Sequence, residues 1–471
     1  MPLKTCIVIS LFIFSFSKYL NQAQIDAINK LIEERMKTVK LNKFGIIIAN
    51  STSVIHQKVF GEGITTKSRF PLASVTKSFT ALGILKLGVP LDQTIDKFHL
   101  GKYIDDDLAK KITVKDLLTH SSGLAKASPK LEKKKGEFLY SNYGYSLLGK
   151  IIEDQSQEKN YGDYIKNHIL DELDMTDSGT DYVNDFMDSY DNIFGFPSKY
   201  HGLESEYTFD NGWDIPAGYV RSTLEDMGKY IQSYLNGKNN DYIRQMGEPK
   251  TKIDYNLNYG MGLFVRNRNG KGIYDHSGVL ISFLTHVYIY PDMDLAYFLF
   301  TNTNDGLCPG PFYRFMYNLE NLILDDVIPY EQTFDLLDYA EFISIHTIID
   351  LLIIIIIAIP LTYFILTIIK KFKKRKPTWF YGVKGKIIFG VDFVLLIILP
   401  IILLALLTNF AKPTKDFLFT LLTLTISMMV TFIVKLVYFF LYRKYWEGME
   451  DDEKIKKNNE SLYDVNDFQS Q

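Results

Sequence analysis

The chain has 471 residues, of which 47% are hydrophobic, and its formal net charge is -3 at pH 7. This length has room for one large domain or roughly two or three ordinary ones. The near-balanced charge gives no reason to expect a nucleic acid as a partner. Cys6 lies in a predicted export signal, so the mature chain keeps one thiol, Cys308, and must be stabilised by its core rather than by a disulfide.

Residues 1–17 have the pattern of a secretory signal peptide. Lys4 supplies a positive charge, an apolar run extends from Cys6 to Phe16, and Ser15 and Ser17 are small residues near the expected cleavage point. An uncleaved anchor is the alternative, but the apolar run is short for a bilayer span. We therefore expect the chain to be exported and the signal to be removed.

Residues 24–327 are predicted to form one domain of strands and helices. Two apolar runs separated by a polar turn predict a β-hairpin over residues 44–49 and 54–60. Further strands are predicted over residues 262–266, 282–290 and 295–301. Helices are predicted over residues 24–40, 74–87, 146–154, 223–235 and 311–324. Strands at both ends with helices between them predict an α+β domain, in which helices flank one antiparallel sheet and an inserted helical region lies in the middle.

The character of the sequence changes after this domain. Residues 328–344 read as a linker, and residues 345–369, 387–407 and 417–441 are each long and apolar enough to be transmembrane helices. The loop between the first two spans is rich in Lys and Arg and has no acidic residue, which places it in the cytoplasm. Three spans then predict a multi-pass protein of the cell membrane, with the lipid bilayer as a partner, an exoplasmic domain and a cytoplasmic tail over residues 442–471.

A Ser-x-x-Lys motif lies where an extended segment ends and a helix is predicted to begin. Its Ser74 and Lys77 would lie one turn apart on the same helical face. A serine is a poor nucleophile unless a base takes its proton. Lys77 can act as that base only if its surroundings lower its pKa from about 10.4 towards about 7 to 8. Ser156 and Lys159 have the same spacing, so the motif needs support from the rest of the chain.

Two later motifs supply the other groups that hydrolysis through an acyl-enzyme requires. Tyr140 offers a phenol for proton transfer, and Asn142, on the same side of an extended tripeptide, can hold a substrate amide. His276, expected at the start of a strand, can donate to a substrate oxygen, and Gly278 permits close approach of a substrate backbone. His120 is interpreted as a hydrogen-bonded, loop-forming histidine rather than a base. The histidines lack metal-ligand spacing, so neither a metal nor a cofactor is predicted.

Together these stretches resemble the class C β-lactamase and penicillin-binding-protein-like serine hydrolases, a family that also holds D-Ala-D-Ala carboxypeptidases, D-aminopeptidases and esterases. The matching stretches are residues 73–80, 113–124, 140–149, 217–237 and 276–278. The resemblance covers about residues 25–321. It implies a β-lactamase/transpeptidase-like fold and the cleavage of an amide or ester in a small-molecule or peptide substrate, such as a D-amino-acid peptide.

The resemblance also implies a role for each matching residue. Ser74 would be the acylated nucleophile, Lys77 its proton acceptor and Tyr140 the second general acid/base. The substrate-binding residues would be Asn142, His276, Ser277, Gly278 and Val279. The backbone N–H groups of Ser74 and Val279 would form the oxyanion hole. The sequence leaves open whether Lys77 or a deprotonated Tyr140 takes the first proton, because the two would titrate as a coupled pair.

Two departures from the family pattern concern the substrate. His276 stands where the β-lactamases have a lysine, so a permanently charged anchor for a carboxylate is exchanged for one that loses its charge above about pH 6.5. Val279 replaces the usual small residue and should narrow the pocket. The alternative function is a non-hydrolytic, regulatory membrane protein that binds peptidoglycan-like peptides or β-lactams, although a site freed from catalysis has no reason to keep all three motifs.

Overall fold

The computed structural model divides into two compact units, residues 1–345 and 346–471. In the first unit the structure describes residues 20–38, 41–181, 189–193, 196–200, 212–248, 250–268, 270–280, 282–304 and 310–325. In the second unit it describes residues 362, 365–366, 382–399, 401–402, 425, 428–430, 432–433, 436–437 and 440.

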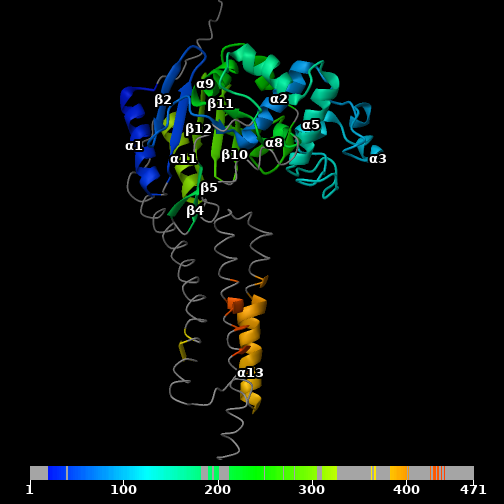
Figure 1. Cartoon of the computed structure of the whole chain (residues 1–471). Helices are drawn as coiled ribbons and strands as arrows, with labels where there is room; N and C mark the ends of the chain where they lie inside the picture. The colour runs from blue at the N-terminus through cyan, green and yellow to red at the C-terminus, as the bar shows by residue number, and fades with distance from the viewer. Residues whose placement is uncertain are drawn as a thin grey trace, which may run out of the picture. The chain divides into compact units, whose positions relative to one another are not determined.

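An antiparallel sheet forms the centre of the first unit (Figure 1). Among the described residues it has eight strands, in the order β2-β1-β12-β11-β10-β9-β8-β7. Their bounds are β1 (Phe44–Ala49), β2 (Val54–Phe60), β7 (Thr251–Lys252), β8 (Leu257–Tyr259), β9 (Phe264–Arg268), β10 (Lys271–Val279), β11 (Leu284–Tyr290) and β12 (Leu295–Thr301). Strand β1 pairs with β12 along its whole length, so a strand from the start of the domain and one from its end lie side by side, next to the edge strand β2.

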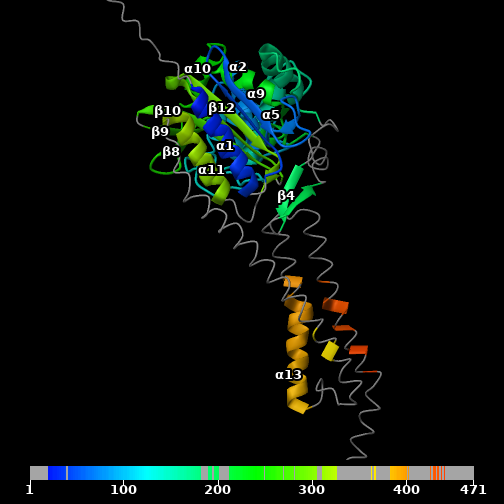
Figure 2. The same ribbon diagram turned by 90° about the vertical axis from the view of Figure 1, so that its left-hand side faces the viewer.

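Helices cover both faces of this sheet. Helices α1 (Gln22–Thr38) and α11 (Gly310–Asp325) pack together on one face, and Figure 2 shows them lying across the sheet. The other face carries the larger core, built on α2 (Thr76–Leu87), α5 (Asn142–Gln155), α8 (Ile215–Gly218) and α9 (Leu224–Ser233). Helix α2 is buried over most of its length and contacts both α5 and α8, which makes it the centre of this layer.

Shorter elements complete the first unit. The remaining helices are η1 (Ala73–Val75), η2 (Ile95–Lys97), α3 (Asp106–Ala109), α4 (Val114–Leu118), α6 (Tyr161–Ile165), η3 (Lys166–Leu170), η4 (Asp171–Leu173), α10 (Asn240–Met246) and η5 (Pro291–Met293). Two small sheets are formed by β3 (Phe70–Pro71) with β6 (Arg221–Ser222), and by β13 (Thr303–Asn304), β4 (Ser189–Ile193) and β5 (Phe196–Tyr200). The predicted α+β architecture, with an inserted helical region between the strands, is confirmed.

The second unit contains helix α13 (Gly382–Phe393), which continues as the π-helical segment η6 (Val394–Ile398). Over the residues that the structure describes, no helix is both long enough and apolar enough to cross a bilayer. Most of the predicted spans 345–369 and 417–441, part of the span 387–407, and all of the predicted signal, linker and tail lie outside the described residues. The membrane segments and the signal therefore stay predictions.

Candidate active site

Ser74 lies in a tight turn between the sheet and helix α2. Ala73, just before it, adopts a left-handed backbone with a φ of +50°. Leu72 donates its N–H to the Val220 carbonyl (2.8 Å) and accepts a hydrogen bond from Thr285 Oγ1 (2.6 Å). Because these bonds hold the turn from both sides, the strained backbone is maintained and Ser74 is presented, partly exposed, beside the first turn of α2.

Lys77 is fully buried one turn further along, and its amine faces Ser74. Its Nζ atom is 3.2 Å from Ser74 Oγ and donates a hydrogen bond to the Ala217 carbonyl at 2.5 Å. Burial lowers the pKa of Lys77 well below its usual value; the Asp214 carboxylate opposes this shift and the Lys126 charge adds to it. The desolvated amine is therefore driven towards its neutral form, which can accept a proton.

Tyr140 reaches the same two side chains from the segment that precedes α5. Its ring centroid lies 4.9 Å from Lys77 Nζ, and its phenol lies close enough to Ser74 for that hydroxyl to influence the pKa of Tyr140. Burial raises the pKa of the Tyr140 phenol, although the Ser74 hydroxyl opposes this shift. The phenol therefore keeps its proton at neutral pH. The structure thus brings the three predicted catalytic residues together.

Asn142 is the first residue of α5, which corrects two sequence-based expectations. The helix begins four residues before the predicted start at residue 146, and residues 140–142 are not one extended tripeptide. The reason is a helix cap, because Ser141 Oγ accepts the Gly144 N–H at 3.0 Å. Asn142 Oδ1 is buried and has no hydrogen-bond partner among the described residues. Such an unpaired acceptor is available to a substrate amide.

The end of β10 carries the second predicted binding set, which consists of His276, Ser277, Gly278 and Val279. This set closes a strand rather than opening one, because the strand begins at Lys271 and its first half pairs with β9. A Cβ at Gly278 would lie 2.3 Å from the Leu72 carbonyl oxygen and 2.2 Å from Thr285 Oγ1. Glycine therefore lets β10 lie against the turn of Ser74. Val279 follows at the strand end, and its side chain is 52% exposed.

His276 lies inside the protein rather than at the surface of the site. The Tyr259 hydroxyl lies 3.0 Å from Nε2, and Nδ1 lies 2.7 Å from the Ser277 carbonyl oxygen, an arrangement that fits a neutral ring protonated on Nδ1. Burial and the nearby Lys77 lower the pKa of His276 to about 3, far below the expected value near 6.5. The ring is thus uncharged at neutral pH, and a substrate that takes a hydrogen bond from it must displace one of these partners.

Two groups of the site were not predicted from the sequence. The carbonyl of Ala217 has no side-chain signature, and Tyr259 resembles any core tyrosine until its hydroxyl is seen next to His276. The signal that the sequence offered near Tyr259 is the glycine at position 262. In the structure, Gly262 has a φ of +77°, and a Cβ there would lie 2.6 Å from the Lys77 carbonyl oxygen. That glycine marks a close approach of the Tyr259 loop to α2.

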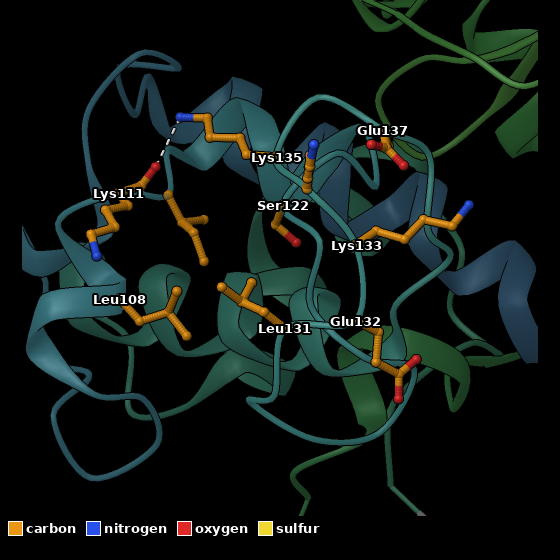
Figure 3. Close-up of a pocket in the computed structure, with 10 residues that line it drawn as sticks. Leu108, Lys111, Ser122, Leu131, Glu132, Lys133, Lys135 and Glu137 are labelled. Carbon is orange, nitrogen blue, oxygen red and sulfur yellow. Dashed lines mark hydrogen bonds between the residues drawn. The ribbon is translucent and has the colours of Figure 1, made fainter.

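A separate hollow of about 580 Å³ lies under the long loop that joins His120 to Tyr140 (Figure 3). It is lined by Leu108, Lys111, Ile112, Ser122, Leu131, Glu132, Lys133, Lys134, Lys135 and Glu137, and none of the predicted catalytic residues is among them. Lys135 donates to the Lys111 carbonyl (2.9 Å) and forms an ion pair with the buried Asp116 (2.8 Å). These contacts hold the loop in place. The hollow therefore results from the packing of this loop and is separate from the predicted catalytic residues.

An antiparallel sheet covered by helices on both faces, with Ser74, Lys77 and Tyr140 gathered at the start of α2, is the arrangement of a β-lactamase-type serine hydrolase. The family model described as Beta-lactamase matches residues 28–310, which is more than half of the chain. The chain therefore belongs to the Beta-lactamase family of serine hydrolases.

Two relatives show how far the similarity extends. Protein Flp of Staphylococcus aureus (strain NCTC 8325 / PS 47) is 27% identical over 335 residues, which cover 61% of this chain and 64% of Flp. Beta-lactamase-like protein 4 of Dictyostelium discoideum is 28% identical over 261 residues, which cover 45% of each chain. The chain thus spans less than two thirds of the length of these relatives.

Two solved structures are similar to this one. The octameric penicillin-binding protein homologue from Pyrococcus abyssi has a TM-score of 0.55 at 26% identity, covering 65% of this chain and 79% of that chain. The D-stereospecific amidohydrolase from Streptomyces sp. has a TM-score of 0.50 at 18% identity, covering 59% of this chain and 94% of that chain. The second likeness shows the fold alone. Both agree with the β-lactamase/transpeptidase-like fold expected from the sequence.

Proposed function

We propose that the chain is a membrane-anchored, exoplasmic serine hydrolase that cleaves an amide or ester through an acyl-enzyme on Ser74. One observation carries the proposal: the buried amine of Lys77 lies 3.2 Å from Ser74 Oγ and has a strongly lowered pKa. A D-amino-acid peptide or a related ester is the proposed substrate class. The similarity to a penicillin-binding protein homologue from Pyrococcus abyssi supports this class.

In the proposed acylation step, Ser74 Oγ attacks the substrate carbonyl carbon while its proton passes to the neutral Lys77 amine. The negative charge that develops on the carbonyl oxygen is held by the backbone N–H groups of Ser74 and Val279. Asn142 binds the amide next to the scissile bond with its unpaired Oδ1. Tyr140 donates its phenol proton to the leaving amine or alcohol as the bond to the carbonyl carbon breaks.

Burial favours Lys77, rather than a deprotonated Tyr140, as the first proton acceptor. The same desolvation lowers the pKa of the lysine and raises the pKa of the tyrosine, so it favours the neutral form of both groups. A neutral amine accepts a proton, whereas a neutral phenol donates one. Proton transfer from the Lys77 ammonium to Tyr140 after the first step restores both groups, and a water molecule then hydrolyses the acyl-enzyme through the same pair.

The proposal is tested by labelling the full-length chain with a fluorophosphonate probe and a fluorescent penicillin. Ser74→Ala should abolish labelling, because no other hydroxyl is paired with Lys77 in the described site. Ser156→Ala is the matched control, since Ser156 and Lys159 have the same Ser-x-x-Lys spacing outside the site. Labelling of the Ser74→Ala protein at the wild-type rate would sink the proposal.

The same experiment separates hydrolysis from non-hydrolytic binding. An acyl-enzyme that forms on Ser74 and then disappears, with release of the free acid, supports the proposed hydrolase. An acyl-enzyme that persists without release supports the alternative of a binding or regulatory membrane protein. Competition by D-Ala-D-Ala peptides, β-lactams and short-chain esters then identifies the acyl donor, and competition by esters alone points to an esterase.

The membrane part of the proposal rests on the three apolar stretches and on the basic loop between the first two. A membrane-impermeant amine reagent added to intact cells should modify the exposed lysines Lys126 and Lys134 of the catalytic domain. The reagent should modify the lysines of the basic loop, Lys370, Lys371, Lys373, Lys374 and Lys376, only after the cells are permeabilised. The reverse pattern would contradict the proposed orientation.

A further inference from the structure

His120 forms hydrogen bonds to the residues on both sides of Tyr140. Its backbone carbonyl accepts the Leu139 N–H at 2.9 Å, and its ring Nδ1 accepts the Ser141 N–H at 3.1 Å. One bond uses the backbone of His120 and the other uses its side chain. A single residue therefore clamps the peptide groups that flank the phenol of the site.

This clamp depends on an unusual backbone conformation. His120 has a φ of +54°, in the left-handed region that residues other than glycine rarely adopt. Gly123, three residues later in the same turn, also has a positive φ of +77°. The turn therefore uses glycine at one such position and histidine at the other. Strain of this kind persists only where the surrounding structure maintains it, and it is a reason to look for a function.

The His120 ring is packed among the tyrosines of the site. It is fully buried, and its centroid lies 4.3 Å from that of Tyr140, 4.5 Å from that of Tyr259 and 5.0 Å from that of Tyr145. Because Nδ1 accepts a hydrogen bond, the ring proton belongs on Nε2, which has no partner among the described residues. Burial lowers the pKa of His120 well below its usual value, which keeps Nδ1 free to accept.

The His120 ring is one of several groups that fix the end of the long loop near Tyr140: the Leu139 N–H also bonds the His120 carbonyl (2.9 Å), and the Tyr143 N–H bonds the Lys126 carbonyl (3.0 Å). Residues 121–139 form the connection between His120 and Tyr140. Hydrogen bonds within it, such as that from the Gly136 N–H to the Ser121 carbonyl (2.8 Å), fix residues that precede Tyr140. On the far side, Ser141 Oγ donates to the Ala125 carbonyl (2.7 Å) and caps α5. The His120 ring bonds the peptide group that joins Tyr140 to this cap.

We propose that His120 is a positioning residue for the proposed hydrolase. By accepting the N–H groups on both sides of Tyr140, it holds the phenol at Ser74 and Lys77. This inference rests on the proposed function. It adds a role for the ring that does not require His120 to touch the substrate or to exchange a proton.

Two substitutions at position 120 distinguish the contribution of the His120 ring from that of its backbone. Glycine and asparagine both tolerate a left-handed backbone at position 120, but only asparagine keeps a side-chain acceptor for the Ser141 N–H. For the full-length chain acting on an ester that acylates Ser74, we expect kcat to fall about 100-fold in His120→Gly. In His120→Asn it should fall less than about 10-fold, and KM should change little in either variant. Equal kcat values in the two variants would overturn the proposal.

The double variants test whether the effect passes through Tyr140. On a Tyr140→Phe background, His120→Gly and His120→Asn should have the same kcat, because no phenol is left to position. A difference of the same size as on the wild-type background would show that the ring acts elsewhere. His286→Phe is the control: that histidine also bonds a buried group, Asp275, but outside the site, and its kcat should match the wild type.

Hydrogen–deuterium exchange gives a readout that does not depend on catalysis. The amide of Ser141 should exchange faster in His120→Gly than in His120→Asn, because only the glycine variant lacks an acceptor for it. Equal exchange in the two variants would contradict the clamp even if the enzyme proved inactive on every substrate tried. A chain that shows no turnover but shows this difference would overturn the proposed function and leave the clamp in place.

Discussion

Asp275 and His276 are neighbours on β10, but their side chains lie on opposite faces of the sheet and meet different surroundings. Asp275 shares its face with the core under α1 and α11. It is 6% exposed, accepts a hydrogen bond from Arg266 Nε (2.8 Å) and lies 3.1 Å from His286 Nε2. Burial alone would raise the pKa of Asp275, but the bond with His286 and the charge of Arg266 lower it below its usual value.

The α2 face holds buried ionisable groups that are not paired in this way. Lys77, His120 and His276 are each at most 1% exposed, and none of them forms an ion pair within the described residues. Burial is the largest cause of the lowered pKa of all three. Their partners are carbonyl oxygens, hydroxyl groups and an amide N–H.

The buried ionisable groups on the two faces have different roles: those on the Asp275 face contribute to stability, and those on the α2 face to the proposed chemistry. Where a buried charge has a partner of opposite sign, it stays charged and holds elements together. Where a basic group is desolvated without such a partner, it is driven to its neutral form and becomes a proton acceptor. One strand therefore carries a structural charge on one side and borders the proposed catalytic groups on the other.

The largest expected change on the structural face comes from Asp275→Asn. Removing the carboxylate leaves Arg266 without its counter-charge, so the free energy of unfolding should fall by about 3 kcal/mol. The pKa of Asp275 is lowered in the folded protein, so the stabilising effect of its carboxylate is present above about pH 4 and is lost as the pH falls through the folded pKa. In Asp275→Asn, this pH dependence of the free energy of unfolding should be absent. The free energy of unfolding is measured by urea titration, with unfolding monitored as the loss of fluorophosphonate labelling. The rate of labelling of the folded protein should not change.

A smaller effect on the same face is expected from His286→Phe. The substitution removes one hydrogen bond to Asp275 but keeps the ion pair with Arg266 and an aromatic ring to stack on Tyr288. The loss of stability should be about 1 kcal/mol, again by urea titration. A loss as large as that of Asp275→Asn would mean that His286, not Arg266, is the main partner of the carboxylate.

The regular elements were predicted well where the local pattern decides them. Strands β1 and β2 and strand β12 have the bounds expected from their apolar runs and flanking turns. The start of α5 was wrong, because Asn142-Tyr143-Gly144-Tyr145 does not read as helix and the cap at Ser141 decides it. The place of His276 was wrong because pairing with β9 extends the strand back to Lys271.

The site could be predicted only where side chains carry the chemistry. Ser74, Lys77 and Tyr140 were expected from three short motifs, and the structure brings them together. The carbonyl of Ala217 and the hydroxyl of Tyr259 become partners of the site only through folding. The burial of the His276 ring, which removes its charge, likewise depends on residues distant in the sequence.

The central claim is that Lys77 is a neutral amine that takes the proton of Ser74. Its most direct test is the pH dependence of inactivation by a fluorophosphonate. Because the acceptor must be unprotonated, the rate should rise with pH through the folded pKa of Lys77 and level off well below pH 10. Lys77→Arg, which keeps the charge, should lower the plateau about 1,000-fold. A midpoint near the unperturbed value of about 10.4, or an unchanged rate in Lys77→Arg, would contradict the account.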